Sequence, residues 1–431
     1  MTQGDVVAGE KSSGGRVYYG WYILAVTFAM LFFGNTIRQS FGLFFKPILA
    51  EFQMSRAELS LPIALSLILY GVSQPIGGLL IRRYGSRAII TIGTALTAIA
   101  ILGMSQISSF WGIYLFYGVI LGAGGIGNSF TGVAPLLTNW FRERRGFALS
   151  IASSGSSTGQ LLGVPVLVLL LAALGWRTTF FWVGIALLCG IVPLCFFMIR
   201  NEPGEAEREE SAPSPGGAGQ TTSYPVPYDL PWVQCLHKTP FILLLTSFFT
   251  CGFTVTVIGI HWIPFATDVG FSAAVAASAF AVGGGLNTVG TLIAGPLSDR
   301  LGRKIPLSLI YLFRGLGFLL FIFFKNDVTV WATPMMIGLS WIATVPLTSA
   351  LTGDFFGARN VGVLFGLITL SHQLGAGLSA WLSGYIYDVT GSYNLAFALA
   401  AYLCLQAAVI VFFINEKETR KPLAAAAPEP A

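Results

Sequence analysis

Charged residues are scarce in this sequence. Asp, Glu, Lys and Arg make up 10% of its 431 residues, whereas hydrophobic residues make up 54%. Soluble domains carry about 25% charged residues, so the composition excludes a chain that is surrounded by water on all sides. Apolar runs of about 20 residues, the length that crosses a bilayer, recur along the chain. Because only helices and closed barrels satisfy their backbone in lipid, the sequence predicts an all-α membrane protein.

Two further shortages concern the chemistry of the chain. It has five cysteines, whose spacing fits neither a metal site nor a disulfide framework, so we expect them to pack as small hydrophobic residues. A nucleotide-binding loop of the form G-x-x-x-x-G-K-[ST] is missing, which argues against direct use of ATP. We therefore predict no metal, no cofactor and no enzymatic activity.

The apolar runs predict twelve membrane-spanning helices. The first run is too long for the core of a signal peptide, so we expect it to remain in the protein. The predicted spans are residues 19–45, 57–81, 88–106, 110–139, 146–171, 177–199, 240–265, 273–297, 305–324, 331–353, 361–386 and 394–414.

The distribution of basic residues predicts the orientation of these spans. Of the 24 Lys and Arg residues, 18 fall on the side of both termini, two fall inside spans, and four fall on the opposite side: Lys46, Arg56, Arg177 and Lys325. Loops on the cytoplasmic side of a membrane carry such an excess. We therefore predict an inner-membrane protein with cytoplasmic termini. The excess is explained by topology, so it indicates no nucleic-acid partner.

A polar stretch divides the chain in two. Residues 201–236 are rich in Pro, Gly, Ser and Glu and have too little apolar surface to fold. The predicted organisation is a cytoplasmic tail at 1–18, a six-helix bundle at 19–200, a flexible linker at 201–236, a second six-helix bundle at 237–415 and a cytoplasmic tail at 416–431.

The two bundles are similar in sequence. "GGLLIRRYGSR" from Gly77 follows the second span, and "GPLSDRLGRK" from Gly295 follows the eighth. Gly78 and Gly295 differ by 217 positions, as do Ser55 and Ser272 at the start of the preceding helices. Such repeats predict two pseudo-symmetric halves with a solute site between them near the membrane midplane.

The second of these loops resembles the signature of the major facilitator superfamily, G-x-L-x-D-R-x-G-R-K, at every defined position. The resemblance implies that the loop latches the halves on the cytoplasmic side in the outward-open state, and that its first glycine lets helices approach closely. In the first copy Arg82 occupies the acidic position. The predicted latch residues are Gly78, Arg83, Gly85, Arg87, Gly295, Asp299, Arg300, Gly302 and Arg303.

Within the superfamily the chain resembles bacterial monocarboxylate porters and the related oxalate/formate antiporters, in "FFKPI", "YGSR", "RRGFA" and "GWR". That resemblance implies transport of a small carboxylate. One departure is clear, because the Asp and Arg that these porters carry in the eighth helix correspond to Asn287 and Thr291. Proton-driven drug exporters carry an Arg in the fourth helix, where this chain has Gly118.

Ionisable residues inside spans are costly and are therefore functional candidates. Arg38, in the first span, is the candidate that would bind an anionic solute; the alternative is that it reaches the headgroups. Arg314 either ties helices together or contacts the solute. His372 and His261 are candidates for proton coupling, because imidazole titrates near neutral pH, or are neutral hydrogen-bonding groups.

Polar residues on the expected cavity-lining helices complete the predicted binding site. They could contact the solute or form hydrogen bonds between helices. The candidates for substrate binding are Asn35, Arg38, Asn128, Gln160, Asn287, His372 and Gln373.

The sequence thus predicts a secondary transporter that moves a small organic anion by alternating access. Cations in the spans without a mid-span carboxylate favour an anion, with a proton as coupling ion or with exchange. We expect a small-molecule substrate, a lipid bilayer around the chain and a monomeric functional unit. The alternative within transport is export of an uncharged or cationic compound. A polytopic enzyme or receptor is the alternative from another class.

Overall fold

The computed structural model describes residues 18–141, 145–203, 228 and 230–416. Within these ranges every regular element is a helix, and no strand occurs. The helices, which include three short π-helical segments, are α1 (Gly20–Gln39), α2 (Phe41–Phe52), α3 (Arg56–Ser105), α4 (Phe110–Ile113), η1 (Tyr114–Ile120), α5 (Leu121–Gly124), α6 (Phe130–Trp140), α7 (Arg145–Thr158), η2 (Gly159–Gly163), α8 (Val164–Ala186), η3 (Leu187–Ile191), α9 (Val192–Met198), α11 (Trp232–Cys235), α12 (Thr239–Asp268), α13 (Ala273–Leu301), α14 (Lys304–Phe323), α15 (Asp327–Leu339), α16 (Thr344–Thr390) and α17 (Asn394–Phe412).

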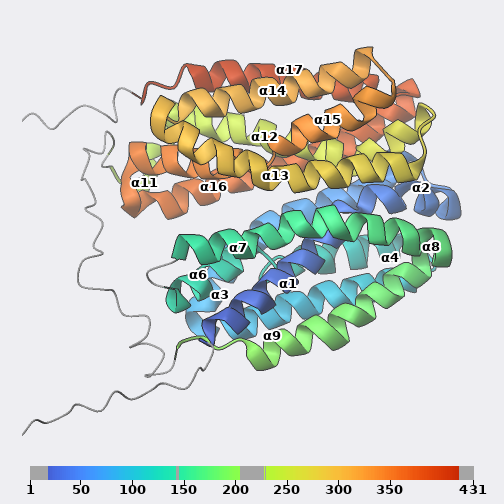
Figure 1. Cartoon of the computed structure of the whole chain (residues 1–431), viewed down its shortest axis with the longest axis horizontal. Coiled ribbons are helices and arrows are strands. Elements are labelled where there is room, and N and C mark those ends of the chain that lie inside the picture. Colours follow the sequence, from blue (N-terminus) through green and yellow to red (C-terminus); the bar gives the residue numbers. More distant parts are fainter. Residues whose placement is uncertain (1–17, 142–144, 204–227, 229, 417–431) are drawn as a thin grey trace, which may run out of the picture.

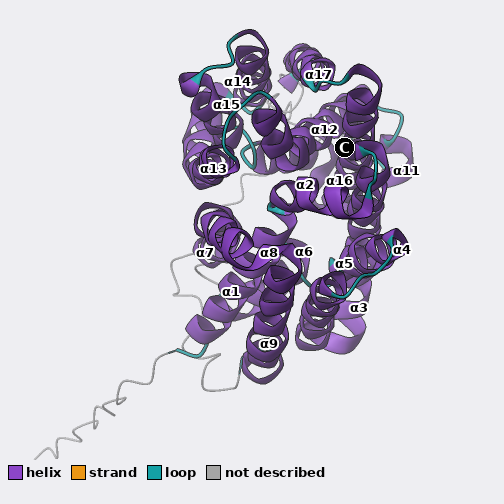
Figure 2. Ribbon diagram, turned by 90° about the vertical axis from the view of Figure 1, so that its right-hand side faces the viewer, coloured by secondary structure: helices purple, strands orange, loops and turns teal. Residues whose placement is uncertain are grey.

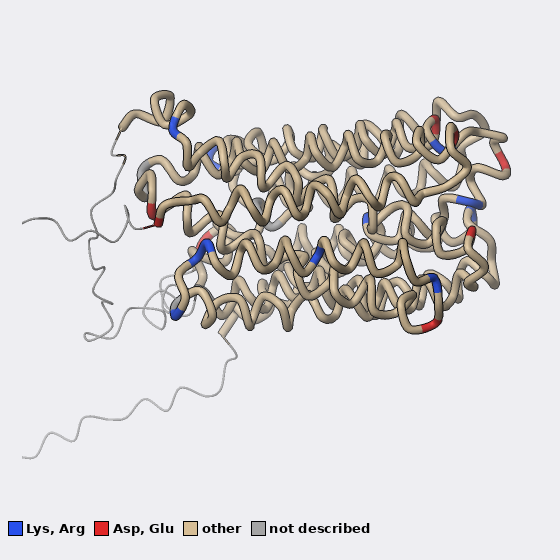
Figure 3. The backbone as a smooth tube through the Cα atoms, turned by 90° about the horizontal axis from the view of Figure 1, so that it is seen from above, with Lys and Arg blue, Asp and Glu red and all other residues tan. Residues whose placement is uncertain are grey.

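The helices form two groups that lie side by side. The N-terminal half contains α1 to α9 and the C-terminal half contains α11 to α17 (Figure 1). We call the end of the bundle where α9 stops and α11 begins the linker end, and the end where α2 lies the far end. In the view onto the far end, α2 and α16 lie between the two groups (Figure 2). The coloured positions of Lys, Arg, Asp and Glu gather mainly at the two ends of the long axis (Figure 3).

Nine helices of the described residues are long and apolar enough to cross a membrane. Two of these candidate helices are much longer than one crossing requires. The first is α3, which contains two helical stretches that meet at Gly85, where φ is 82°. In the other, residues 147–198, the helix changes course at Gly175, where φ is 75°. Together with α4 to α6, this arrangement is consistent with the twelve predicted crossings. A positive φ is available to glycine at little cost, which explains why the chain turns at these residues.

The predicted internal repeat has a structural counterpart. Gly302 has a φ of 82°, the same as Gly85, and the two positions differ by 217 residues. Ser55 and Ser272, separated by the same number, both cap a helix, because each hydroxyl accepts a hydrogen bond from the backbone N–H three residues later. Equivalent turns and caps thus recur at equivalent positions in the two halves.

Three predicted spans are interrupted, one of them, 110–139, between α5 and α6. The span predicted at 19–45 breaks at Ser40 and continues as α2 to Phe52. The Ser40 hydroxyl donates a 2.6 Å hydrogen bond to the Thr36 carbonyl, so the side chain competes with the backbone for this acceptor. The span predicted at 331–353 is interrupted between α15 and α16. There Arg314 donates hydrogen bonds to the carbonyls of Ser340 and Trp341, which the break leaves without helical partners.

Part of the predicted linker belongs to the C-terminal half. The described portion carries the short helix α11, and the Leu230 carbonyl accepts a 2.8 Å hydrogen bond from the Asn360 side chain. Residues 204–227 and 229 of the predicted linker, and most of the two predicted tails, lie outside the described residues.

The two halves pack closely toward the far end, along α3 and α16. A Cβ at Gly384 of α16 would lie 2.7 Å from the Arg56 carbonyl, and one at Gly377 would lie 3.2 Å from the Ala64 carbonyl. One at Gly71 would lie 2.7 Å from the side chain of Gln373. Small residues at these points let the helices approach, as is common between membrane helices.

Candidate functional site: a cavity between the two halves

A cavity of about 190 Å³ lies where the halves meet. Each half contributes to its wall, as the sequence repeat predicts for a solute site. The lining side chains that carry polar atoms are Asn35, Arg38, Gln39, Ser66, Tyr70, Tyr117, Thr256, Trp341, His372 and Gln373. The remaining lining residues are Ile63, Leu67, Leu121, Val255, Gly259, Ile260 and Ala376.

Arg38 is positioned by the end of α1. The helix stops at Gln39, so the guanidinium belongs to its last turn, where the helix dipole favours a cation. The guanidinium carbon lies 3.7 Å from the centre of the Tyr70 ring, a cation–π contact. The cavity lining contains no Asp or Glu, and no ion pair of Arg38 with a described residue is found. These contacts explain how a cation is held here without an acidic partner.

His372 and Gln373, on α16, contribute to the wall from the C-terminal half. The His372 Nδ1 is buried and has no hydrogen-bond partner among the described residues. Its ring lies against Phe248, with centroids 4.9 Å apart. A Cβ at Gly252 would collide with the His372 carbonyl, so α12 and α16 meet directly behind the histidine. The imidazole therefore has one polar atom without a partner, at a position on the cavity wall.

Four of the seven predicted substrate-binding residues share this cavity: Asn35, Arg38, His372 and Gln373. Asn35 also donates a 2.9 Å hydrogen bond to the Ser156 carbonyl, which links α1 to α7. The other three lie outside the cavity lining and join helices. Asn128 donates to Thr97 at 3.2 Å, Gln160 donates to the Phe280 carbonyl at 3.2 Å, and the side chain of Asn287 accepts from the Ile342 N–H at 2.8 Å.

The two other ionisable candidates also lie away from the cavity. The ring nitrogens of His261 lie 3.1 Å from the Tyr393 hydroxyl and 2.9 Å from the Ala380 carbonyl, so both have partners. Arg314 is fully buried, and besides its two carbonyl contacts it donates to Cys251 and Thr254 at 3.2 Å each. These are the contacts expected of a residue that ties helices together.

The predicted latch residues lie at the linker end. The Arg303 guanidinium forms an ion pair with Asp354 and donates to the Ala350 carbonyl at 2.7 Å, within the C-terminal half. The Arg87 N–H donates to Asn201 at 2.8 Å, within the N-terminal half. Arg83 lies over the Tyr84 ring, Arg300 is exposed, and the side chain of Asp299 is outside the described part.

The expectation that Gly295 lies at a close helix contact is wrong for this arrangement. A Cβ built on Gly295 would have no atom within 4 Å, and the same holds for Gly78 in the first copy. The reason is that the close packing of the halves described above does not extend to these positions, so both glycines face open space.

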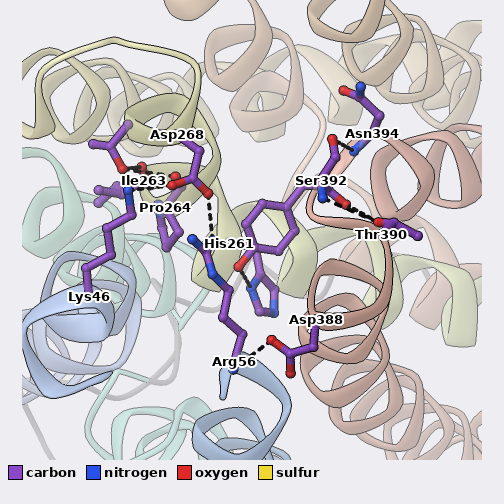
Figure 4. A network of polar contacts seen from close by, with 12 residues as sticks. Lys46, Arg56, His261, Ile263, Pro264, Asp268, Asp388, Thr390, Ser392 and Asn394 are labelled. Atoms are coloured by element: carbon purple, nitrogen blue, oxygen red, sulfur yellow. Dashed lines mark hydrogen bonds and ion pairs between the residues drawn. The ribbon is translucent and has the colours of Figure 1, made fainter. Parts of the chain in front are cut away.

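The far end holds a polar network that the sequence did not predict. The Asp268 carboxylate of α12 forms ion pairs with Lys46 at 2.6 Å and with Arg56 at 2.7 Å (Figure 4). Asp388 of α16 accepts hydrogen bonds from the backbone N–H groups of Arg56 at 3.0 Å and Ala57 at 2.7 Å. A carboxylate of one half thus caps the first turn of a helix of the other half.

Aromatic rings complete this network. The Arg56 guanidinium carbon lies 3.4 Å from the centre of the Tyr387 ring and 5.0 Å from that of Tyr393. One signal in the sequence pointed to the network: Lys46 and Arg56 are two of the four basic residues on the side where the charge distribution places few. Such residues are candidates for a specific role because topology does not account for them.

Comparison with known proteins assigns this chain to a family. A profile of the Major Facilitator Superfamily matches residues 23–380 and 343–431. The chain belongs to this superfamily. It is therefore a multi-pass membrane transporter and not an enzyme, and the superfamily predicted from the signature loop is confirmed.

Relatives of this transporter match it over nearly its whole length. It is 27% identical over 412 residues to the uncharacterized MFS-type transporter YcxA of Bacillus subtilis, covering 93% of this chain and 97% of that protein. It is 26% identical over 422 residues to monocarboxylate transporter 13 of Bos taurus, covering 96% and 94%. The resemblance to monocarboxylate transporters is thus confirmed as a similarity along nearly the whole chain.

A solved structure has the same fold. A bacterial homologue of the human lysosomal transporter Spinster, in an inward-facing and unoccupied conformation, superposes with a TM-score of 0.67 at 18% sequence identity. The match covers 94% of this chain and 97% of that chain. The likeness concerns the arrangement of the helices.

Proposed function

We propose that this transporter moves a small organic anion with one carboxylate across the inner membrane, as a secondary transporter working by alternating access. The observation that carries the proposal is Arg38. It is a cation on a cavity wall that both halves build, and that wall has no acidic residue to neutralise it.

The chemistry of the guanidinium supports a carboxylate as the solute group. A planar guanidinium can bind a carboxylate with two parallel hydrogen bonds. One face of Arg38 lies on Tyr70, which leaves its N–H groups available at the edges. A cationic solute would place two like charges in a cavity of low dielectric, which is unfavourable. The positive charge of the cavity wall therefore favours an anion over the cationic compounds that the alternative function, export, would involve.

The contacts between the halves support a conformational cycle. In the present arrangement Asp268 and Asp388 hold the far end together, while Gly78 and Gly295 face open space at the linker end. With the linker end assigned to the cytoplasm, this is the state in which the solute exchanges with the cytoplasm. In the opposite state the far-end pairs separate, and the glycines of the two signature loops become contact points. One chain supplies both halves, so the functional unit is a monomer.

His372 is the proposed site of proton coupling. It lies on the same cavity wall as Arg38, and its Nδ1 has no partner among the described residues. An imidazole is a side chain that can bind and release a proton, so a proton could enter and leave with the solute. His261, in contrast, uses both ring nitrogens in hydrogen bonds. We expect His372→Gln to retain solute exchange but to weaken accumulation driven by a pH gradient, and unchanged accumulation would exclude the coupling role.

Counterflow with purified protein in liposomes tests the main proposal. Against a panel of mono- and dicarboxylates, the wild-type protein should exchange monocarboxylates. Arg38→Gln should abolish this exchange, and Arg38→Lys should weaken affinity while retaining transport, because Lys keeps the charge but loses the planar pair of donors. Arg208→Gln, which removes one positive charge from the predicted linker, is the matched control. Wild-type affinity of Arg38→Gln for the transported anion would contradict the proposal.

A further inference from the structure

The wall around Arg38 combines polar side chains with three aromatic ones. Tyr70, Tyr117 and Trp341 line the cavity together with aliphatic side chains from both halves. Tyr117 is supported by Phe41, with ring centroids 4.3 Å apart, and Trp341 by Phe280, at 6.1 Å. A solute composed of little more than a carboxylate would bind Arg38 but would leave this surface in contact with water. The wall therefore fits a solute with an apolar body of its own.

We propose that the preferred solute is an aromatic monocarboxylate of about the size of benzoate or phenylacetate. The inference rests on the proposed function, since it assumes that Arg38 binds a carboxylate. It adds the part of the solute that is not charged: a flat apolar ring, held between the aromatic side chains of the N-terminal half and Trp341 of the C-terminal half.

The volume of the cavity supports a ring of this size. An apolar cavity of about 150 Å³ holds one benzene molecule. The cavity here, at about 190 Å³, has room for one such ring and a carboxylate beside it. A second carboxylate would have no second guanidinium or ammonium group to pair with, because Arg38 is the only Lys or Arg of the lining, and a buried charge without a counter-ion is costly. The single cation of the lining therefore disfavours dicarboxylates.

Gly259 lies at the part of the cavity wall that limits the size of the solute. A Cβ built on Gly259 would meet only the Gln39 side-chain oxygen and the Trp341 ring, each at 3.7 Å, which is ordinary van der Waals contact. The two neighbouring glycines differ. A Cβ at Gly252 would collide with the His372 carbonyl, and one at Gly42 would lie 2.7 Å from the Ile260 carbonyl.

Packing therefore requires glycine at Gly252 and Gly42 but not at Gly259. A side chain at Gly259 would project into the cavity beside Trp341 without disturbing the helices. We infer that this glycine keeps the space open for the body of the solute, and that it determines how large that body can be.

The first test is competition on the wild-type protein. Reconstituted protein is assayed for counterflow of benzoate, phenylacetate, pyruvate, lactate and terephthalate. Benzoate or phenylacetate should bind about five- to tenfold more tightly than pyruvate, the ratio that an aromatic contact supplies. Terephthalate, with two carboxylates, should bind more weakly than benzoate. Equal or tighter binding of pyruvate, or tighter binding of terephthalate than of benzoate, would overturn the inference.

The second test reduces the space. Gly259→Ala, and more strongly Gly259→Val, should weaken binding of benzoate and phenylacetate several-fold while leaving pyruvate unchanged. Gly366→Ala is the matched control, since a Cβ there would meet no atom within 4 Å and Gly366 lies on α16 outside the cavity lining. If Gly259→Ala weakened binding of all the acids equally, or if Gly366→Ala changed the selectivity in the same way, Gly259 would not determine the size of the solute.

The outcomes separate the inference from the function on which it rests. If no anion exchanges, or if Arg38→Gln exchanges normally, the proposed function fails. If pyruvate or lactate is exchanged in an Arg38-dependent manner but aromatic acids are not preferred, only the inference fails. The competition on wild-type protein decides this even if a Gly259 variant does not insert into the membrane.

Discussion

The far end and the linker end of the bundle differ in how their charged residues are used. At the far end, Lys46 and Arg56 of the N-terminal half bind Asp268 of the C-terminal half. At the linker end, Arg303 binds Asp354 of its own half, and Arg87 contacts Asn201 of its own half. The described contacts of these residues therefore join the halves at one end and stabilise each half separately at the other.

This difference indicates what kind of contact a moving interface can use. Ion pairs close to water are modest in strength, typically about 0–1 kcal/mol when exposed, and can break and reform. Toward the cavity the halves meet through glycines instead, where a Cβ at Gly377 would lie 3.2 Å from the Ala64 carbonyl. The equivalent surface at the linker end, at Gly78 and Gly295, is uncovered. An interface that opens at one end and closes at the other requires ion pairs that can break and glycine surfaces against which helices can pack.

Removing Asp268 should change the far end most. Asp268→Asn removes the carboxylate that Lys46 and Arg56 share, and it leaves Arg56 without its acidic side-chain partner. A loss of about 1–2 kcal/mol from the closed far end would shift the open and closed populations about tenfold. Hydrogen exchange of residues 41–57 and 262–270 should accelerate accordingly. Asp327→Asn, at an exposed position at the start of α15, is the control, and equal hydrogen exchange in both variants would contradict this role for Asp268.

At the linker end, Asp299→Asn should act in the opposite direction. The signature loop is the proposed latch of the other state, so its loss should favour the far-end-closed state and slow the cycle several-fold with little change in solute affinity. Counterflow rates over a range of solute concentrations give both quantities. Hydrogen exchange at the far end should not accelerate in Asp299→Asn, whereas it should in Asp268→Asn. A normal transport rate would remove Asp299 from the latch.

Asp388→Ala should have a smaller effect than Asp268→Asn. It removes a carboxylate that accepts from the N–H groups of Arg56 and Ala57 but leaves both ion pairs of Asp268 in place. Loss of a helix cap costs about 1 kcal/mol, a several-fold shift of the populations. The expected signature is faster exchange of the first turn of α3, with smaller changes at 262–270. Exchange as fast as in Asp268→Asn would reverse the proposed ranking of the two carboxylates.

Glu51→Gln should have the smallest effect, because its contacts stay within the N-terminal half. The hydrogen bond from Arg177 lowers the pKa of the Glu51 carboxyl, although partial burial opposes this, and the Trp176 indole also donates to it. A lowered pKa means that the charged carboxylate stabilises the fold above its unfolded pKa, and that this contribution is lost as the pH falls through the lower, folded value.

We expect Glu51→Gln to lower the melting temperature by only about 1 °C at pH 7, since the pair is exposed, and this difference from the wild-type protein to disappear as the pH falls through the folded pKa of Glu51. Hydrogen exchange at 262–270 should be unchanged. If this variant opened the far end as Asp268→Asn does, the distinction between contacts within and between halves would be lost.

Arg38 and Asn128 illustrate how far a sequence can predict a site in a membrane protein. Both were candidates for contact with the solute, because both are polar residues in spans, and for Asn128 a hydrogen bond between helices was the alternative. Arg38 lies on the cavity wall, while Asn128 donates to Thr97 within the N-terminal half. In a soluble helix the apolar stripe shows which face is buried, but membrane helices are apolar on all sides, so the sequence contains little information on how each helix is rotated.

The interrupted spans could not be predicted for a related reason. The break near Ser340 depends on Arg314 from another helix, which satisfies the carbonyls that the break exposes. The sequence around the break near Ser340 is as apolar as that of an unbroken helix. Tyr70, Tyr117 and Trp341 were missed as well, because an aromatic residue in a span fits lipid, a helix contact or a cavity equally well.

The sequence by itself determined the class of the molecule, its internal repeat and its superfamily. These follow from the lengths of apolar runs, from positions that differ by 217 residues, and from a loop of defined spacing, all of which are properties of the linear chain. The tertiary structure alone decided which side chains share the cavity with Arg38, and that Arg56 and Asp268 close the far end. Those outcomes depend on how helices far apart in the chain rotate and pack against each other, and packing between apolar surfaces is set by shape and small residues, not by a pattern that one helix contains.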